Sequence, residues 1–159
     1  PPLDYALVRH LKRERPHLTI VINGGIGSLD DVQAHLDDSD GVALDGVMLG
    51  RAAYHEPALL GQVDRRVFAD GNPDVDAFAA IANYRPYLMA RLDEGVPLHA
   101  MTRHMLGVMH ARPGARLFRR ILTTEAIRPG ADIGVVDQAL DAVRDAEARI
   151  RERAAAEAE

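Results

Sequence analysis

Residues 18–28 read LTIVINGGIGS, and this stretch decides the fold class. Residues 18–22 are apolar and mostly β-branched, which is typical of a strand buried on both faces of a sheet. The run ends at residues 23–25, and Ser28 then predicts a helix N-cap with two aspartates in the first helical turn. The stretch therefore predicts a strand, a glycine turn and a helix that extends to about residue 36.

A second strand is predicted one helix further along the chain. Residues 46–49 form another short apolar run, which ends at a Gly-Arg pair, and a helix-like segment broken near Pro57 follows. Upstream, the apolar spacing of residues 3–15 predicts a helix that ends before Pro16. A strand, helix and strand at this spacing predict two parallel neighbours joined by a right-handed crossover.

The second half of the chain changes character. Residues 73–159 contain no strand candidate, and apolar spacing predicts four helices, at residues 74–94, 98–110, 115–126 and 132–153. Asp132 is the expected cap of the last helix. We therefore predict an α/β domain over residues 1–72 and an all-α domain over residues 73–159.

The two predicted strands end in groups that suit an anion. Asn23, Gly24 and Gly25 follow the first strand, and Gly50 with Arg51 follows the second. Glycines let backbone N–H groups approach an anion, the next helix presents its positive end, and the arginine adds a charged fork. Each signal alone is also typical of an ordinary turn or a solvated arginine. The pairing favours the phosphate site formed after the last two strands of a TIM barrel.

One short segment concentrates positive charge in a chain of net charge −5. Residues 103–128 carry six arginines and a single acid. Arg116, Arg119 and Arg120 share a helical face, with Arg103 on the adjacent predicted helix. We expect the opposite face to be buried, at Leu117, Phe118, Ile121 and Leu122. The arginine face predicts a phosphate-tracking surface for RNA, with a solvated arginine face as the alternative.

The remaining polar residues predict no further site. The seven histidines show no convincing metal-ligand spacing with a carboxylate, and the pair Asp30-Asp31 suits a helix start better than catalysis. Methionines at positions 101, 105 and 109 predict core packing. We expect no metal and, because no apolar run is long enough to cross a bilayer, no membrane association and a cytoplasmic location.

Several runs of sequence together resemble the tRNA-dihydrouridine synthase family, and its A subfamily most closely. These runs are TIVINGGIGSLDDVQAHL, DGVMLGRAAYHEPALL, residues 101–107 and residues 113–122, in that order. The resemblance extends from residue 1 to about residue 145. It implies the C-terminal part of an FMN-binding (β/α)8 TIM barrel over residues 1–72 and a helical tRNA-binding domain over residues 73–159.

The resemblance also implies roles for individual residues. Asn23, Gly24, Gly25, Gly50 and Arg51 would hold the FMN phosphate. Arg116 and Arg119 match positions that contact tRNA in the A subfamily, and Arg120 and Arg103 are further candidates. The implied reaction reduces a D-loop uridine to dihydrouridine: reduced FMN gives hydride to C6, a cysteine protonates C5, and NADPH reduces the flavin again.

The chain departs from the family pattern in two respects. It contains no cysteine, so we assign no catalytic residue here and expect the chain alone to be inactive. Residues 40–46 add about five residues by a local duplication of the Asp-Gly-Val pattern, which we expect to lengthen a loop at the closed end of the barrel.

The chain begins at Pro1, and two strands alone would leave a sheet edge unpaired, so we expect the upstream barrel half to complete the fold. Two other functions stay open. One is another FMN barrel oxidoreductase acting on a small molecule, and the other is a non-catalytic RNA-binding remnant.

Overall fold

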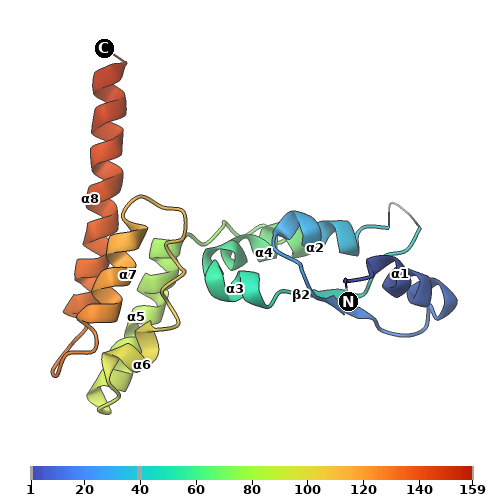
Figure 1. Cartoon of the computed structure of the whole chain (residues 1–159), viewed down its shortest axis with the longest axis horizontal. Helices are drawn as coiled ribbons and strands as arrows, with labels where there is room; N and C mark the ends of the chain where they lie inside the picture. The colour runs from blue at the N-terminus through green and yellow to red at the C-terminus, as the bar shows by residue number, and fades with distance from the viewer. Residues whose placement is uncertain (1, 39–40, 159) are drawn as a thin grey trace. The chain divides into compact units, whose positions relative to one another are not determined.

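The computed structural model describes residues 2–38 and 41–158, which divide into two compact units (Figure 1). The first unit comprises residues 1–54 and 62–74. The second comprises residues 55–61 and 75–159. The chain is therefore helix-rich with one small sheet in its first unit, a mixed α/β architecture.

The first unit alternates helices with two parallel strands, as predicted. Its elements are α1 (Tyr5–Glu14), β1 (Val21–Asn23), α2 (Leu29–Leu36), β2 (Gly46–Met48), α3 (Arg51–His55, whose last residue belongs to the second unit) and α4 (Val63–Phe68). The strands pair in register, Val21 with Gly46 and Asn23 with Met48. Consequently both strands end at the same edge of the sheet.

The first strand is shorter than the sequence predicted and is not buried on both faces. Residues 18–20 lie outside the strand. Among the described residues, the backbone of Ile20 bonds only Asp45, which precedes β2. The Ile20 N–H donates to the Asp45 carboxylate at 2.7 Å, and the Ile20 carbonyl accepts from the Asp45 N–H at 3.1 Å. Within the strand, Ile22 is buried, but Val21 is 57% exposed and Met48 on the neighbouring strand is 46% exposed. The face of the sheet that carries Val21 and Met48 is exposed because no described residue covers it.

The core of the first unit forms on one side of the sheet. α2 packs against β2 and α4, and its apolar residues join Ile22 in the core. The buried apolar residues of this unit are Ile22, Ile26, Leu29, Val32, Val42 and Leu44. Arg66 of α4 pairs with Asp30 of α2 and fixes the contact between these two helices.

The duplicated segment is packed and does not form a free loop. Residue 40 of the duplication lies outside the described residues, but Val42 and Leu44 are buried, and Arg9 donates to the Val42 carbonyl at 2.9 Å. Lys12 pairs with the Asp45 carboxylate at 2.7 Å. The segment precedes β2, so it lies at the edge of the sheet opposite Gly25.

The second unit consists of helices joined by turns, with no strand among its described residues. Its elements are the 3₁₀ helix η1 (Pro57–Gln62, whose last residue belongs to the first unit), α5 (Ala77–Asp93), α6 (Leu98–Thr102), α7 (Ala115–Thr124) and α8 (Gly134–Glu157). Three apolar side chains of α8 are buried in the core of this unit: Val136, Leu140 and Val143. The prediction that Asp132 caps this helix is wrong, because α8 begins at Gly134 with Ile133 as its N-cap. The Asp132 carboxylate lies one residue earlier and accepts from the Gly134 N–H at 2.8 Å.

One predicted helix is wrong in length. The helix expected over residues 98–110 ends at Thr102, and turns follow to the start of α7. Met101, Met105 and Met109 are nevertheless all buried, as predicted. Residues in successive turns can still bury their side chains, because burial depends on whether a side chain packs into the core and not on a continuous helix.

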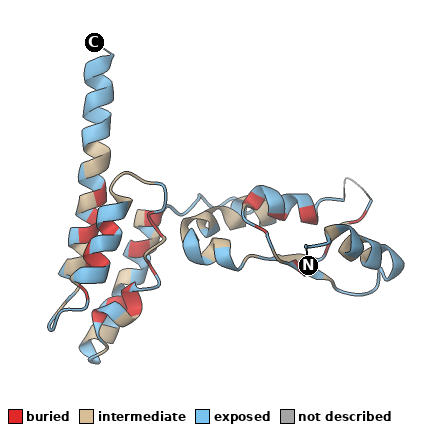
Figure 2. Ribbon diagram, viewed as in Figure 1, coloured by how far each residue is buried: buried red, intermediate tan, exposed pale blue. Residues whose placement is uncertain are grey.

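The start of α7 lies close against the middle of α8. Gly114 has φ +82°, and a Cβ there would meet the Ala142 carbonyl at 2.7 Å, so only glycine fits. Figure 2 shows buried residues on the first half of α8, where it lies beside α7, and exposed residues along its far end.

Candidate functional site

The two glycine-bearing strand ends lie side by side. Because Asn23 pairs with Met48 in the parallel sheet, Gly24 and Gly25 leave the same edge as Gly50 and Arg51. Asn23, Gly25, Gly50 and Arg51 are all exposed there. The predicted parallel arrangement is confirmed, whereas the predicted phosphate-binding role of these five residues stays a prediction.

The Gly24–Gly25 turn is held in a conformation that favours glycine. Their φ angles are +115° and +68°. The Leu3 side chain lies 3.0 Å from the position of a Cβ on Gly24, and the Tyr5 hydroxyl lies 2.6 Å from that of a Cβ on Gly25. The same hydroxyl donates to the Gly24 carbonyl at 2.7 Å. The glycines are therefore required by chain packing as well as by any approaching anion.

Sequence reasoning missed the part that Tyr5 takes in this turn. The residue lies in the first turn of α1, and the apolar spacing of that helix gave no reason to connect it with Gly24, 19 positions away. The contact became visible only with the fold.

The start of α2 is already occupied by its own side chains. Ser28 and Asp31 form a capping box: the Asp31 carboxylate accepts from the Gly27 and Ser28 N–H groups at 3.1 and 3.0 Å, and the Ser28 hydroxyl accepts from the Asp31 N–H. The hydrogen bond from Gly27, followed by that from Ser28, holds the pKa of Asp31 below its usual value. A carboxylate at this helix end disfavours a second anion, so the predicted contribution of the α2 terminus is corrected. The donors left are those of the glycine turn.

Removal of the capping hydroxyl should loosen α2 locally. In Ser28→Ala, we expect the amide protons of α2 to exchange about fivefold faster, because an N-cap contributes about 1 kcal/mol to helix stability. Hydrogen exchange followed by mass spectrometry or NMR measures this. Ser28→Thr keeps a capping oxygen and should exchange nearly as slowly as the parent; equally slow exchange in Ser28→Ala would mean that the cap does not stabilise α2.

Arg51 is free to bind an anion. It is the first residue of α3 and is exposed. Over residues 2–38 and 41–158, its guanidinium has no hydrogen-bond or ion-pair partner. By contrast, Arg65 forks onto Asp74 through two hydrogen bonds of 2.6 and 2.7 Å. The unpartnered fork at a strand end is the group expected of a phosphate site.

The structure separates the arginines of the basic segment into paired and unpaired ones. Arg112 pairs with Glu147 at 3.1 Å, Arg128 pairs with Glu125 at 2.6 Å, and Arg103 donates to the His104 imidazole at 3.0 Å. The guanidinium groups of the other three arginines are exposed and have no partner among the described residues: Arg116, Arg119 and Arg120 of α7. An imidazole that accepts a hydrogen bond carries no negative charge, so Arg103 keeps its positive charge. The unneutralised charge of this segment therefore lies on Arg103 and on α7.

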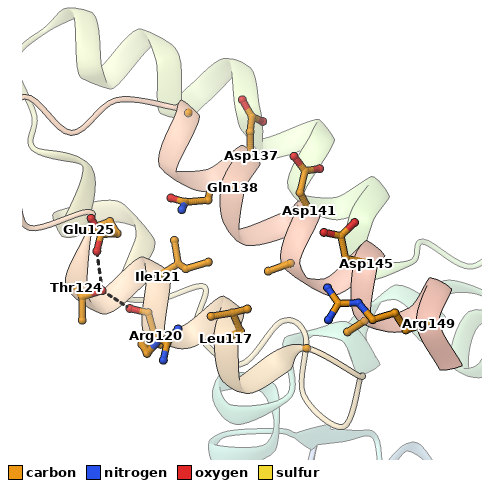
Figure 3. Close-up of a pocket in the computed structure, with 14 residues that line it drawn as sticks. Leu117, Arg120, Ile121, Thr124, Glu125, Asp137, Gln138, Asp141, Asp145 and Arg149 are labelled. Atoms are coloured by element: carbon orange, nitrogen blue, oxygen red, sulfur yellow. Dashed lines mark hydrogen bonds between the residues drawn. The ribbon is translucent and has the colours of Figure 1, made fainter.

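Arg120 points to a different side from the other two. It lines a groove of about 710 Å³ between α7 and α8, which neither Arg116 nor Arg119 lines. Figure 3 shows the opposite wall, where Asp137, Asp141 and Asp145 follow one another along α8. Asp137 is paired with Arg85, Asp141 is paired with Arg144, and Arg149 also lines the groove, so these carboxylates are largely offset. The predicted tRNA contact of Arg120, like those of Arg116 and Arg119, stays a prediction.

The buried face of α7 agrees with the sequence in three of four positions. Phe118, Ile121 and Leu122 are buried, but Leu117 is 36% exposed. Leu117 lines the groove because α8 does not close over it. The prediction that Leu117 is buried is therefore wrong.

The other ionisable residues form structural contacts. His35 is buried against Tyr5, and burial, followed by the nearby Arg9 charge, lowers its pKa below the usual value. Asp30 and Asp31 act at the helix start, as predicted. No three His, Asp or Glu side chains gather as metal ligands within the described part of the chain. No helix there has the length and apolar character needed to cross a bilayer.

Comparison with known proteins places this chain in one family. The family model described as dihydrouridine synthase matches residues 1–144. The chain is 47% identical over 145 residues to a tRNA-dihydrouridine(20/20a) synthase of Escherichia coli strain K12, covering 91% of this chain and 41% of that protein. A protein of the same name from Xanthomonas campestris is 45% identical over 150 residues, covering 94% of this chain and 43% of its own length.

The chain thus spans about two fifths of the length of these relatives. The family match covers both strand ends and the whole of α7. The chain belongs to the dihydrouridine synthase family.

Proposed function

We propose that this chain forms the C-terminal part of a flavin-dependent tRNA-dihydrouridine synthase. It would supply the last two strands of the FMN-binding barrel in residues 1–72 and a tRNA-binding helical domain in residues 73–159. The observation that carries the proposal is a pair of adjacent glycine strand ends with a free arginine in a chain that also carries an unpaired basic helix face.

The strand ends fit a phosphate group. The Gly25 N–H has no acceptor among the described residues, and the Arg51 guanidinium has no partner there. Both groups are exposed at one edge of a parallel sheet, where barrel enzymes bind phosphates. Asn23, Gly24, Gly25, Gly50 and Arg51 would hold the FMN phosphate, and FMN would supply the hydride chemistry when bound.

The basic face of α7 fits a tRNA backbone. Arg116 and Arg119 are spaced by one helical turn and are exposed without a partner in the described structure, so phosphates can replace their water at little cost. Arg103 would add a further phosphate contact, because it is exposed and only its Nε is bonded to His104.

Exposed apolar surface of the first unit supports the need for an upstream barrel half. Val21 and Met48 are exposed on the sheet, Leu7 and Leu11 are exposed on α1, and Leu3 is exposed just before that helix. Such surface favours burial against further strands and helices. The complete protein would then comprise the upstream half together with this chain, act in the cytoplasm where tRNA is found, and use NADPH as reductant.

The catalytic proton donor lies outside this chain. The chain has no cysteine, so its residues bind and orient, and they do not protonate uracil. For the isolated chain we expect weak FMN binding at most, because the flavin ring would lack walls.

The proposal is tested by uridine reduction in the complete protein. Unmodified tRNA is incubated with the protein, FMN and NADPH, and dihydrouridine is measured by mass spectrometry of nucleosides, with an omission of NADPH as control. Dihydrouridine that forms only in the full reaction is the expected result. FMN binding with no salt-dependent tRNA binding would favour a small-molecule flavin enzyme, and tRNA binding without flavin would favour a non-catalytic RNA-binding protein.

A further inference from the structure

Tyr5 lies directly against the glycine turn of the proposed phosphate site. Its hydroxyl donates to the Gly24 carbonyl at 2.7 Å. Its ring meets the His35 ring edge-on, with centroids 4.9 Å apart and an interplanar angle of 73°. His35 is only 9% exposed, so the Tyr5 ring rests on a fixed partner.

The hydrogen bond from Tyr5 orients the whole peptide between Gly24 and Gly25, including the Gly25 N–H. A trans peptide is planar, and its carbonyl and N–H point in opposite directions. The peptide between Gly24 and Gly25 is trans, so a Gly24 carbonyl held toward Tyr5 sends the Gly25 N–H away from α1. A hydrogen bond to the carbonyl also polarises the peptide and strengthens its N–H as a donor.

Packing prevents the turn from relaxing on the Tyr5 side. The Tyr5 hydroxyl and a Leu3 methyl lie 2.6 and 2.9 Å from the place of a Cβ on Gly25. The positive φ angles and this contact together favour glycine at position 25 and hold the turn against Tyr5 and Leu3. No described residue accepts a hydrogen bond from the Gly25 N–H.

We propose that Tyr5 is a positioning residue that aims the Gly25 N–H at the phosphate of FMN. The inference rests on the proposed function, since it assigns Tyr5 to the same phosphate site. Tyr5 itself does not touch the phosphate. It acts through the Gly24 carbonyl and the peptide that follows it.

The test compares two flavins in the complete protein. Tyr5→Phe removes one oxygen and keeps the ring against His35. Dissociation constants for FMN and for riboflavin, which lacks the phosphate, are measured by quenching of flavin fluorescence. We expect FMN to bind about fivefold more weakly, the loss typical of one neutral hydrogen bond, and riboflavin to bind as before.

Riboflavin affinity separates positioning from general damage. A role that only supports the fold would lower both affinities together and lower the melting temperature; that result, or an unchanged FMN affinity, would overturn the inference. Tyr87→Phe is the matched control, because Tyr87 is an exposed tyrosine of α5 that stacks on Tyr84 in the second unit. It should change neither affinity.

The same measurements distinguish a failure of Tyr5 from a failure of the site. If the unmodified protein binds FMN no better than riboflavin, the phosphate site itself is wrong, and the inference falls with it. If the unmodified protein prefers FMN, Arg51→Ala removes the preference and Tyr5→Phe does not, the phosphate site stands and only the role of Tyr5 is refuted.

Discussion

Arg51→Ala in the complete protein is expected to weaken FMN binding by about 10- to 100-fold, the range for loss of a hydrogen bond to a charged group. The reason is that Arg51 is the only residue of the proposed phosphate site that carries a positive charge. The Arg51 guanidinium has no described partner in the unbound state, so it can bind the phosphate without breaking an ion pair within the protein. Fluorescence titration with FMN measures the change.

Arg13→Ala is the control for this prediction. Arg13 is an exposed arginine of α1 that also lacks a partner among the described residues. Its removal changes the net charge equally and should leave FMN affinity unchanged. Equal weakening in both variants would show a general field effect, and no weakening in Arg51→Ala would remove Arg51 from the site.

Replacement of both Arg116 and Arg119 by alanine is expected to weaken tRNA binding about tenfold or more at physiological salt and to leave FMN binding unchanged. Each lost phosphate contact should also lower the slope of log affinity against log salt by about 0.7–0.9. A slope lower by about 1.4–1.8 is therefore predicted for the pair. Filter binding or fluorescence anisotropy over a salt series measures both quantities.

The far end of α8 provides a matched control for this pair. Arg151 and Arg153 are exposed arginines with no described partner, and they lie beyond the part of α8 that packs against the core. Replacing both by alanine removes the same charge from the same unit. Equal loss of affinity and slope in the control pair would mean that tRNA binding follows total charge, and not the α7 face.

The sequence predicted the elements of the first unit because local signals agreed there. The β-branched run, the glycine turn and Ser28 all indicated the same strand, turn and helix, and the structure places β1 and α2 accordingly. The prediction of a strand buried on both faces was wrong at Val21, because burial of the second face depends on neighbouring elements that the local sequence pattern does not specify.

The candidate sites were predictable in part. Charge spacing identified Arg116, Arg119 and Arg120 together, but only the fold shows that Arg120 alone of the three lines the groove between α7 and α8. Helix propensity also overextended the helix after Leu98, where buried methionines in turns imitate a helical repeat. Tyr5 could not be connected with Gly24 because contacts 19 positions apart leave no local pattern.

A crystal structure of the complete protein with FMN tests the central claim most directly. The account predicts FMN phosphate oxygens about 2.7–3.2 Å from both the Gly25 nitrogen and the Arg51 guanidinium. A phosphate bound elsewhere, with Gly25 and Arg51 contacting only solvent or other protein groups, would contradict it.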